Sequence, residues 1–489
     1  MMKNQVQLIT YADRLSGGGL SQLDAMLRGP LAGLFAGVHI LPFYYPIDGS
    51  DAGFDPIDHG KVDERLGDWR NVAEIARHTE VMADLIVNHA SAQSPEFIDV
   101  IANGRDSTYW SMFLKEQDVF PDGITAEQSA AIYRPRPGSC FSAKQLASGE
   151  KVNFWTTFTD NQVDINVESE AGAGYLERVL KRFADSGVKI IRLDAAGYAI
   201  KRAGTSCFMT DEAFAFINQL SRRANELGME TIAEIHSYYK TQVDVASRVD
   251  RVYDFALPPL ILHGLFNQDF APLLRWLKIS PRNCLTVLDT HDGIGIIDAG
   301  PEGDKPGLLN AEQIDQLVEQ IHHNSNGDSR QATGAAASNV DLYQVNCSYY
   351  EALGRNDLHY LVARAIQFFC PGVPQVYYAG LLAMHNDMTL LEQTNVGRDI
   401  NRPYLTPAEV ESALQKPVVN ALCRLIKIRN SCEAFSGEFN VTYDDNVLSL
   451  TWQQRQSQAQ LVVDLPREQA KIITSDKGDE QTFDLAAQL

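Results

Sequence analysis

The sequence predicts a (β/α)₈ barrel, because strand-like apolar runs alternate with helix-like segments along most of its length. We count eight such runs, at residues 6–11, 37–42, 81–88, 188–194, 231–236, 252–256, 285–289 and 374–378. Between them lie amphipathic stretches, such as 171–184 and 211–227, whose apolar positions recur at steps of three and four residues. Eight βα units form a closed barrel. An open doubly wound sheet would need a glycine-rich phosphate turn after its first strand, and Gly17-Gly18-Gly19 does not fit that motif.

Two intervals between these runs are too long for plain connections, which predicts inserted domains after the third and seventh strands. The final segment alternates polar and apolar residues at 441–443, 447–452 and 461–465, which predicts a small C-terminal β-domain. The predicted division places the barrel at 1–88, 169–293 and 355–434, the inserted domains at 89–168 and 294–354, and the β-domain at 435–489.

The composition narrows the class of protein. Among 489 residues, 45% are hydrophobic and 21% charged, which is ordinary for a soluble protein. The net charge of -21 repels phosphate backbones and anionic bilayers, so we expect neither nucleic acid nor a membrane as partner. Seven cysteines are scattered singly, without metal-ligand spacing, and should be reduced. No stretch has the length of a signal peptide or a membrane span, which predicts a cytoplasmic location.

Three of the apolar runs lead into a carboxylate, at Asp194, Glu234 and Asp292. Because parallel strands joined by helices place their C-terminal ends on one face of a barrel, these three acids should converge. Arg192 lies two residues before Asp194, on the same face of the strand, and should keep that acid ionised. Glu234 lies between two apolar residues, where partial desolvation should help it to retain a proton.

An ionised carboxylate beside a protonated one is the equipment of a retaining glycosidase-type reaction. Any one of these acids alone would be interpreted as part of a structural ion pair, because carboxylates near loops are common. Three on strand ends, accompanied by Arg192, His236 and His291, favour catalysis.

Short motifs in the same order resemble those of the α-amylase superfamily, glycoside hydrolase family thirteen. They are residues 84–89 (DLIVNH), 162–166 (QVDIN) and 192–194 (RLD), then Glu234 and residues 291–292 (HD). The resemblance implies that Asp194 is the nucleophile, Glu234 the general acid/base and Asp292 the transition-state stabiliser. Calcium-dependent amylases continue the nucleophile strand with a Lys-His pair, where this chain has Gly197-Tyr198. We therefore expect no structural calcium, no other metal and no cofactor.

Within that superfamily the whole chain is most similar to the sucrose phosphorylases. The matching segments are residues 51–59 (DAGFDPIDH), 133–138 (YRPRPG), 234–239 (EIHSYY), 341–344 (DLYQ) and 397–402 (GRDINR). The resemblance implies a glucosyl pocket formed by Asp51, Phe54, His89, Phe158, Arg192, His291 and Arg398. It also implies an acceptor and phosphate site formed by Arg136, Tyr198, His236, Leu342, Tyr343 and Gln344. From the residues alone, Phe54 and Phe158 could equally be core aromatics, His89 a structural histidine, and Arg134 and Arg136 part of a solvated loop.

The activity implied by this resemblance is reversible phosphorolysis of sucrose to α-D-glucose 1-phosphate and fructose. The route would be a double displacement through a β-glucosyl-enzyme, with transglucosylation as a side activity and a homodimer as the assembly. We also expect the segment 341–344 to move between two acceptor states, one of which presents Gln344 and the other Tyr343. Three alternatives stay open: a sister phosphorylase of sucrose 6′-phosphate, glucosylglycerol or glucosylglycerate, an α-glucosidase, and an inactive barrel used as a binding subunit. The presence of all three acids speaks against the last.

Overall fold

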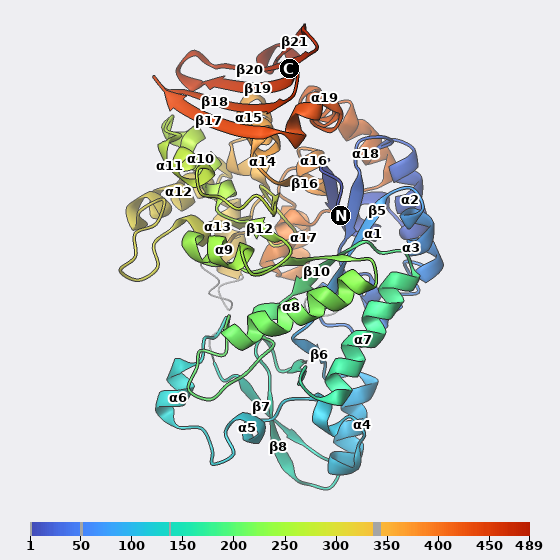
Figure 1. Cartoon of the computed structure of the whole chain (residues 1–489). Coiled ribbons are helices and arrows are strands. Elements are labelled where there is room, and N and C mark those ends of the chain that lie inside the picture. Colours follow the sequence, from blue (N-terminus) through green and yellow to red (C-terminus); the bar gives the residue numbers. More distant parts are fainter. Residues whose placement is uncertain (1, 49–51, 136–137, 336–343) are drawn as a thin grey trace.

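The computed structural model describes residues 2–48, 52–135, 138–335 and 344–489. Eight parallel strands form a closed barrel in the order β1-β16-β13-β12-β11-β10-β5-β2. Their bounds are β1 Gln7–Thr10, β2 Gly37–Ile40, β5 Glu80–Ile86, β10 Ile190–Asp194, β11 Glu230–Ala233, β12 Val252–Asp254, β13 Cys284–Thr286 and β16 Val373–Tyr377. Each strand falls on one of the eight predicted runs, so the predicted barrel is confirmed (Figure 1).

The register of the barrel strands places particular polar residues side by side. Arg192 on β10 lies opposite Asp84 on β5, and Leu193 on β10 lies opposite Ala233 on β11. Asp194 and Glu234, each one residue further along, therefore leave the barrel next to each other. Because β10 and β11 are paired, Asp194 and Glu234 lie in one site although 40 residues separate them in sequence.

The helices that cover the barrel begin at side chains that cap them. Helices α7 (Glu170–Asp185) and α8 (Asp211–Glu226) start after Ser169 and Thr210, whose hydroxyls accept from backbone N–H groups of the first turn. Both helices bury one apolar stripe and expose the other face, as their sequence periodicity predicts. Other long helices are α10 (Leu257–Asn267), α15 (Asp357–Phe369) and α19 (Pro417–Ser431).

The chain between β5 and α7 leaves the barrel and forms a separate small unit, drawn at the bottom of Figure 1. It contains two antiparallel pairs, β6 (His89–Ser91) with β9 (Gln162–Asp164) and β7 (Phe141–Gln145) with β8 (Lys151–Trp155). Part of its apolar core, built around Trp155 and Phe120, is separate from the main barrel core. The exact domain boundaries at which we divide the chain stay a prediction.

A second excursion follows β13 and returns at β16. It contains β14 (Ile294–Gly295), the 3₁₀ turn η4 (Ile297–Ala299), helices α12 (Ala311–Asn324) and α13 (Asp328–Ala335), and β15 (Gln344–Val345). Gly293 begins it with a φ of +104°, and a Cβ there would lie 2.5 Å from the carbonyl oxygen of Val345. Glycine is therefore required where the chain turns directly after Asp292.

The C-terminal segment forms a five-stranded antiparallel sheet, which lies at the opposite end of the molecule from the first excursion (Figure 1). Its strands are β17 (Glu438–Asp444), β18 (Val447–Gln454), β19 (Ser457–Asp464), β20 (Gln469–Asp476) and β21 (Asp479–Asp484). Trp452 on β18 ties the sheet to the barrel by donating from Nε1 to the carbonyl oxygen of Phe369, at 2.7 Å. The predicted β-domain is confirmed, although the alternation in sequence indicated only the first three strands.

All seven cysteines are free thiols. Across the described ranges, no helix is both long enough and apolar enough to cross a membrane.

Candidate active site

The C-terminal ends of the barrel strands open into a cavity of about 630 Å³. Asp194 is the last residue of β10, Glu234 directly follows β11, and Asp292 lies six residues beyond the end of β13. All three predicted acids line the cavity, together with Arg192, His236 and His291. Their carboxylates remain between 13 and 17% exposed, so they are desolvated but can be reached from the cavity.

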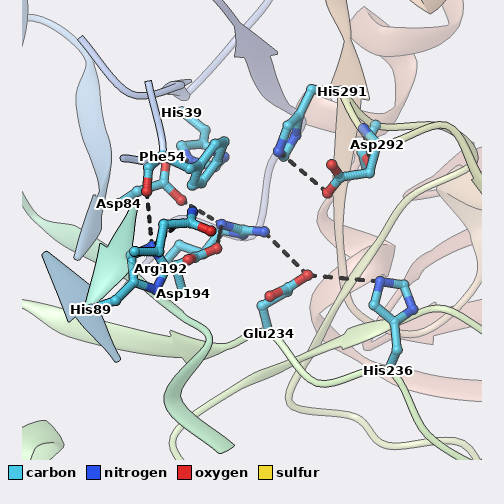
Figure 2. A network of polar contacts seen from close by, with 12 residues as sticks. His39, Phe54, Asp84, His89, Arg192, Asp194, Glu234, His236, His291 and Asp292 are labelled. Carbon is cyan, nitrogen blue, oxygen red and sulfur yellow. Dashed lines mark hydrogen bonds and ion pairs between the residues drawn. The ribbon is translucent and has the colours of Figure 1, made fainter. Parts of the chain in front are cut away.

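Arg192 joins two of the acids. Its Nη1 lies 2.9 Å from Asp194 Oδ1, and its Nη2 lies 3.2 Å from Glu234 Oε1 (Figure 2). The expected cation beside Asp194 is thus present. The surroundings of Glu234 are more polar than its apolar neighbours in sequence predict, because the same guanidinium and the Nε2 of His236, at 3.7 Å, both face it.

The buried carboxylate of Asp84, inside the barrel, holds Arg192 in place. Asp84 Oδ1 accepts from Arg192 Nη1 at 2.7 Å, while Asp84 Oδ2 lies 2.8 Å from His39 Nε2. Burial acts to raise the pKa of Asp84, but the interactions with His39 and Arg192 outweigh it and lower the pKa to about 2. Asp84 therefore stays ionised and fixes the guanidinium that faces the cavity. Asp84 is the first residue of the motif at 84–89, but the sequence analysis did not assign it this role.

Asp292 is held as an anion by several neighbours. Arg398 Nη1 lies 2.9 Å from its Oδ1, and His291 Nε2 lies 3.3 Å from its Oδ2. Burial opposes ionisation, but His291 and the guanidiniums of Arg398, Arg192 and Arg402 hold the pKa of Asp292 well below its usual value. Burial also lowers the pKa of His291 to about 3, so this ring is neutral and acts as a hydrogen-bonding group.

Aromatic and histidine side chains form the walls of the cavity beside the acids. The rings of Phe54 and His291 stack at 5.1 Å between centroids, and the guanidinium of Arg192 lies 5.4 Å from the Phe54 centroid. His89 Nε2 lies 3.0 Å from the carbonyl oxygen of Phe54, and its ring meets Phe158 edge-on at 5.5 Å. The structure thus brings the predicted pocket residues Phe54, His89, Phe158, Arg192, His291 and Arg398 to one cavity.

The other side of the cavity is formed by residues predicted for the acceptor. Tyr198 packs between Phe158 and Phe208, at 5.2 and 4.4 Å, and Gln344 Nε2 lies 3.2 Å from His236 Nε2. The motifs did not indicate Phe208. They also did not indicate Asp298 on η4, which lies behind His236 and carries no sequence signal of its own.

Four predicted site residues lie outside the described residues: Asp51, Arg136, Leu342 and Tyr343. The expected movement of the segment 341–344 likewise falls largely outside them. Arg134 is described, and it turns toward its own loop, where its guanidinium donates to the carbonyl oxygens of Gly138 and Ser129. It does not line the cavity.

A lysine ammonium fills an oxygen cluster next to the site. Lys201 Nζ lies 2.8 Å from Asp164 Oδ2 and 3.1 Å from Asn88 Oδ1, and it donates to the carbonyl oxygen of Tyr198. These hard oxygens are of the kind that bind calcium, but here a fixed cation occupies the centre. Within the described part of the chain, no group of three or more metal-ligating side chains occurs.

Comparisons with known proteins find relatives that match nearly the whole chain. The family model for the α-amylase catalytic domain matches residues 33–251. A sucrose phosphorylase from Agrobacterium vitis is 58% identical over 97% of this chain and 98% of its own. One from Bifidobacterium adolescentis is 53% identical over 95% of this chain and 93% of its own. The crystal structure of a sucrose 6F-phosphate phosphorylase from Thermoanaerobacter thermosaccharolyticum superposes with a TM-score of 0.90, at 35% identity, over 99% and 98% of the two chains.

The barrel, the strand-end acids and the matching catalytic domain define an enzyme of the α-amylase superfamily, of the glycosyltransferase type. Within it, the chain belongs to the sucrose phosphorylase family, as the near full-length identities show. The resemblance inferred from the short motifs is therefore confirmed.

Proposed function

We propose that this protein catalyses the reversible phosphorolysis of sucrose to α-D-glucose 1-phosphate and fructose. The observation that carries the proposal is the sharing of one guanidinium by Asp194 and Glu234 at the mouth of the barrel, in a chain 58% identical to a sucrose phosphorylase. One cation brings the two carboxylates together, as the short separation of a retaining pair, about 5 Å, requires.

The proposed first step is attack of Asp194 on the anomeric carbon of the glucosyl group. Glu234 donates a proton to the departing fructosyl oxygen, which leaves a β-glucosyl-enzyme. Asp292, held ionised by Arg398, stabilises positive charge that develops on the ring. Phe54 and the neutral His291 ring stack on each other at the wall of this pocket, where they restrict it to one glucosyl unit.

In the second step Glu234 acts as the base and phosphate attacks from the side that fructose has left. The product is α-glucose 1-phosphate with net retention of configuration. Water at about 55 M competes, so phosphate has to be positioned, and positioned reactants can reach effective molarities of about 10⁵ M or more. His236 is the described candidate for that positioning, and Arg136 stays a predicted one. Sugars that enter in place of phosphate would give transglucosylation.

Incubation with sucrose and phosphate tests the proposal, with glucose 1-phosphate and free glucose measured together. We expect glucose 1-phosphate to dominate. Sucrose 6′-phosphate, glucosylglycerol and glucosylglycerate serve as competing donors, and a higher kcat/KM for any of them would assign the chain to a sister phosphorylase instead. Release of mainly glucose would indicate an α-glucosidase. A cytoplasmic location and a homodimer stay predictions that these assays do not address.

A further inference from the structure

His236 is held on the acceptor side of the cavity by a stacked ring and by polar contacts at both of its ring nitrogens. Its ring stacks on Phe255 with a centroid distance of 3.8 Å and an angle of 14° between the planes. Its Nδ1 points away from the cavity and lies 3.2 Å from Asp298 Oδ2. Its Nε2 edge faces Glu234 and Gln344, at 3.7 and 3.2 Å. The ring therefore has one edge for Asp298 and one for the acceptor site.

Asp298 is built to accept a hydrogen bond from that ring. It is fully buried, and its Oδ1 accepts from the backbone N–H of Ser237 at 2.9 Å and from Gln242 Nε2 at 3.0 Å. Its Oδ2 is left for His236. Among the residues that the structure describes, no lysine or arginine forms an ion pair with Asp298. A buried carboxylate of this kind stabilises a cation on its histidine partner.

The electrostatics of the surroundings act in the same direction. Burial alone would lower the pKa of His236, but Asp298, and then Glu234 and Asp292, raise it above its usual value. Asp298 comes from η4, Asp292 from the loop after β13 and Glu234 from the strand end that also carries His236. Gln344 on β15 and Phe255 after β12 also contact the ring and carry no charge.

We propose that Asp298 is a positioning residue that keeps His236 as an imidazolium, whose Nε2 edge binds the phosphate anion in the acceptor half of the cavity. The inference deepens the proposed function and rests on it for the identity of the anion. A protonated Nε2 donates to a phosphate oxygen. The Gln344 amide, which can turn over to present its oxygen, accepts from the same edge when no anion is bound.

The other described cations that line the cavity already form ion pairs with acids. His236 is therefore the group that we propose to bind the phosphate anion. Arg192 contacts Asp84, Asp194 and Glu234, and Arg398 contacts Asp292. An anion in the acceptor half would find these guanidiniums already neutralised by carboxylates. A histidine whose own counter-ion lies behind it, away from the cavity, still presents an N–H donor forward.

The variant Asp298→Asn tests the inference, because it removes the charge and keeps the shape. We expect the KM for phosphate at pH 7 to rise about tenfold, which corresponds to the loss of one charge-assisted contact. The alkaline limb of kcat/KM for phosphate should move toward lower pH. The initial burst of fluoride from α-glucosyl fluoride, measured without phosphate before water releases the glucosyl-enzyme, should change in rate by less than about twofold, since this half-reaction needs neither phosphate nor a proton donor. Asp304→Asn, an exposed acid on the same excursion, is the matched control, and the wild type measured in the same buffers corrects for the titration of phosphate itself.

Two further measurements separate this inference from the proposed function. NMR titration of the His236 ring, assigned with His236→Gln, should show a lower pKa in Asp298→Asn than in the wild type, whatever reaction the enzyme catalyses. On the His236→Gln background, Asp298→Asn should not raise the phosphate KM further. An unchanged ring titration, an unchanged phosphate KM, or equal loss in both half-reactions would overturn the inference.

A second variant, Gln242→Met, tests the same inference if Asp298→Asn does not fold. Gln242→Met removes one donor to Asp298 and also removes a buried amide oxygen that has no hydrogen-bond partner among the described residues. Asp298 should then hold the His236 proton more tightly, so the alkaline limb should move toward higher pH. A shift toward lower pH, or none, would count against the inference.

Discussion

The variant Lys201→Met should weaken the attachment of the first excursion to the barrel and lower the stability of the protein. The Lys201 side chain is 1% exposed and links three elements: Asp164 on β9, Asn88 next to the pocket residue His89, and the turn that carries Tyr198. Methionine has a similar volume and fills the space without the charge. After the substitution Asp164, which is fully buried, retains the backbone N–H and the hydroxyl of Thr157 as donors to its carboxylate within the described residues.

Removal of one partner from a buried ion pair leaves an uncompensated charge and typically costs about 3 to 5 kcal/mol. The entropy of unfolding is about 2.1 cal/mol/K per residue, so the 489-residue chain has roughly 1 kcal/mol/K in total if it unfolds as one unit. The expected fall in Tm is therefore about 3 to 5 °C. A larger fall would mean that the excursion melts by itself, because fewer residues share the same loss.

Calorimetry on four proteins forms the test: the wild type, Lys201→Met, Asp164→Asn and the double variant. The double variant should be more stable than the sum of the single losses predicts, by about 2 kcal/mol or more, because it has no unpaired buried charge. Lys181→Met on α7 is the control, since that lysine forms a half-exposed pair with Glu177 and should lose well under 1 kcal/mol. In Lys201→Ala, millimolar calcium should restore part of the stability, because the oxygen cluster is then empty. A loss below about 1 kcal/mol, or additive single losses, would refute this account of Lys201.

Three further predictions concern carboxylates. Asp194→Asn should reduce turnover of sucrose below a few per cent while Tm changes little, because an amide is a poor nucleophile and the residue lines an open cavity. Glu234→Gln should lose turnover of sucrose but retain glucosyl transfer from α-glucosyl fluoride, whose leaving group needs no proton; equal losses would move the acid elsewhere. Burial raises the pKa of Asp254 from 3.8 to about 7, despite hydrogen bonds from Trp276. Between about pH 4 and pH 7 the folded protein therefore holds a proton on Asp254 that the unfolded chain has lost. The free energy of unfolding should fall as the pH rises through this range. Asp254→Asn should remove this decline and raise Tm at pH 8 more than at pH 4, which calorimetry at the two values can check.

The strand pattern of the barrel was predictable because the strands are buried and largely apolar, and because three of them lead into an acid. That is why the sequence alone places the three acids together. The last two strands of the C-terminal sheet were not predictable in the same way. β21 is exposed along nearly its whole length and β20 is buried at only two of its eight positions, so little of the alternation that identifies a half-buried strand is present.

Within the site, sequence indicates which residues leave a strand end but not what supports them. Asp84 and Arg192 are both polar residues inside apolar runs, and the strand register makes them partners. Lys201 stands beside Arg202 in a segment typical of a solvated loop, yet its ammonium is buried. Asp298 lies in a short turn without a motif. Such residues act through contacts between elements far apart in sequence, and periodicity carries no information about those contacts.

The net charge of -21 raises the question of how an anion can bind at all. The screening length at physiological ionic strength is about 8 Å, so most surface carboxylates act weakly on a group inside the cavity. The electrostatic potential at the bound anion is set by neighbours within a few ångströms. On the glucosyl side, Asp194 and Glu234 share the guanidinium of Arg192, and Asp292 pairs with Arg398. The acceptor side differs, because the carboxylate of Asp298 lies behind His236, away from the cavity. Its negative charge interacts with the His236 ring and not directly with the anion. Acidic residues at the surface therefore repel anions, whereas Asp298, buried behind His236, favours the binding of an anion because it stabilises the imidazolium.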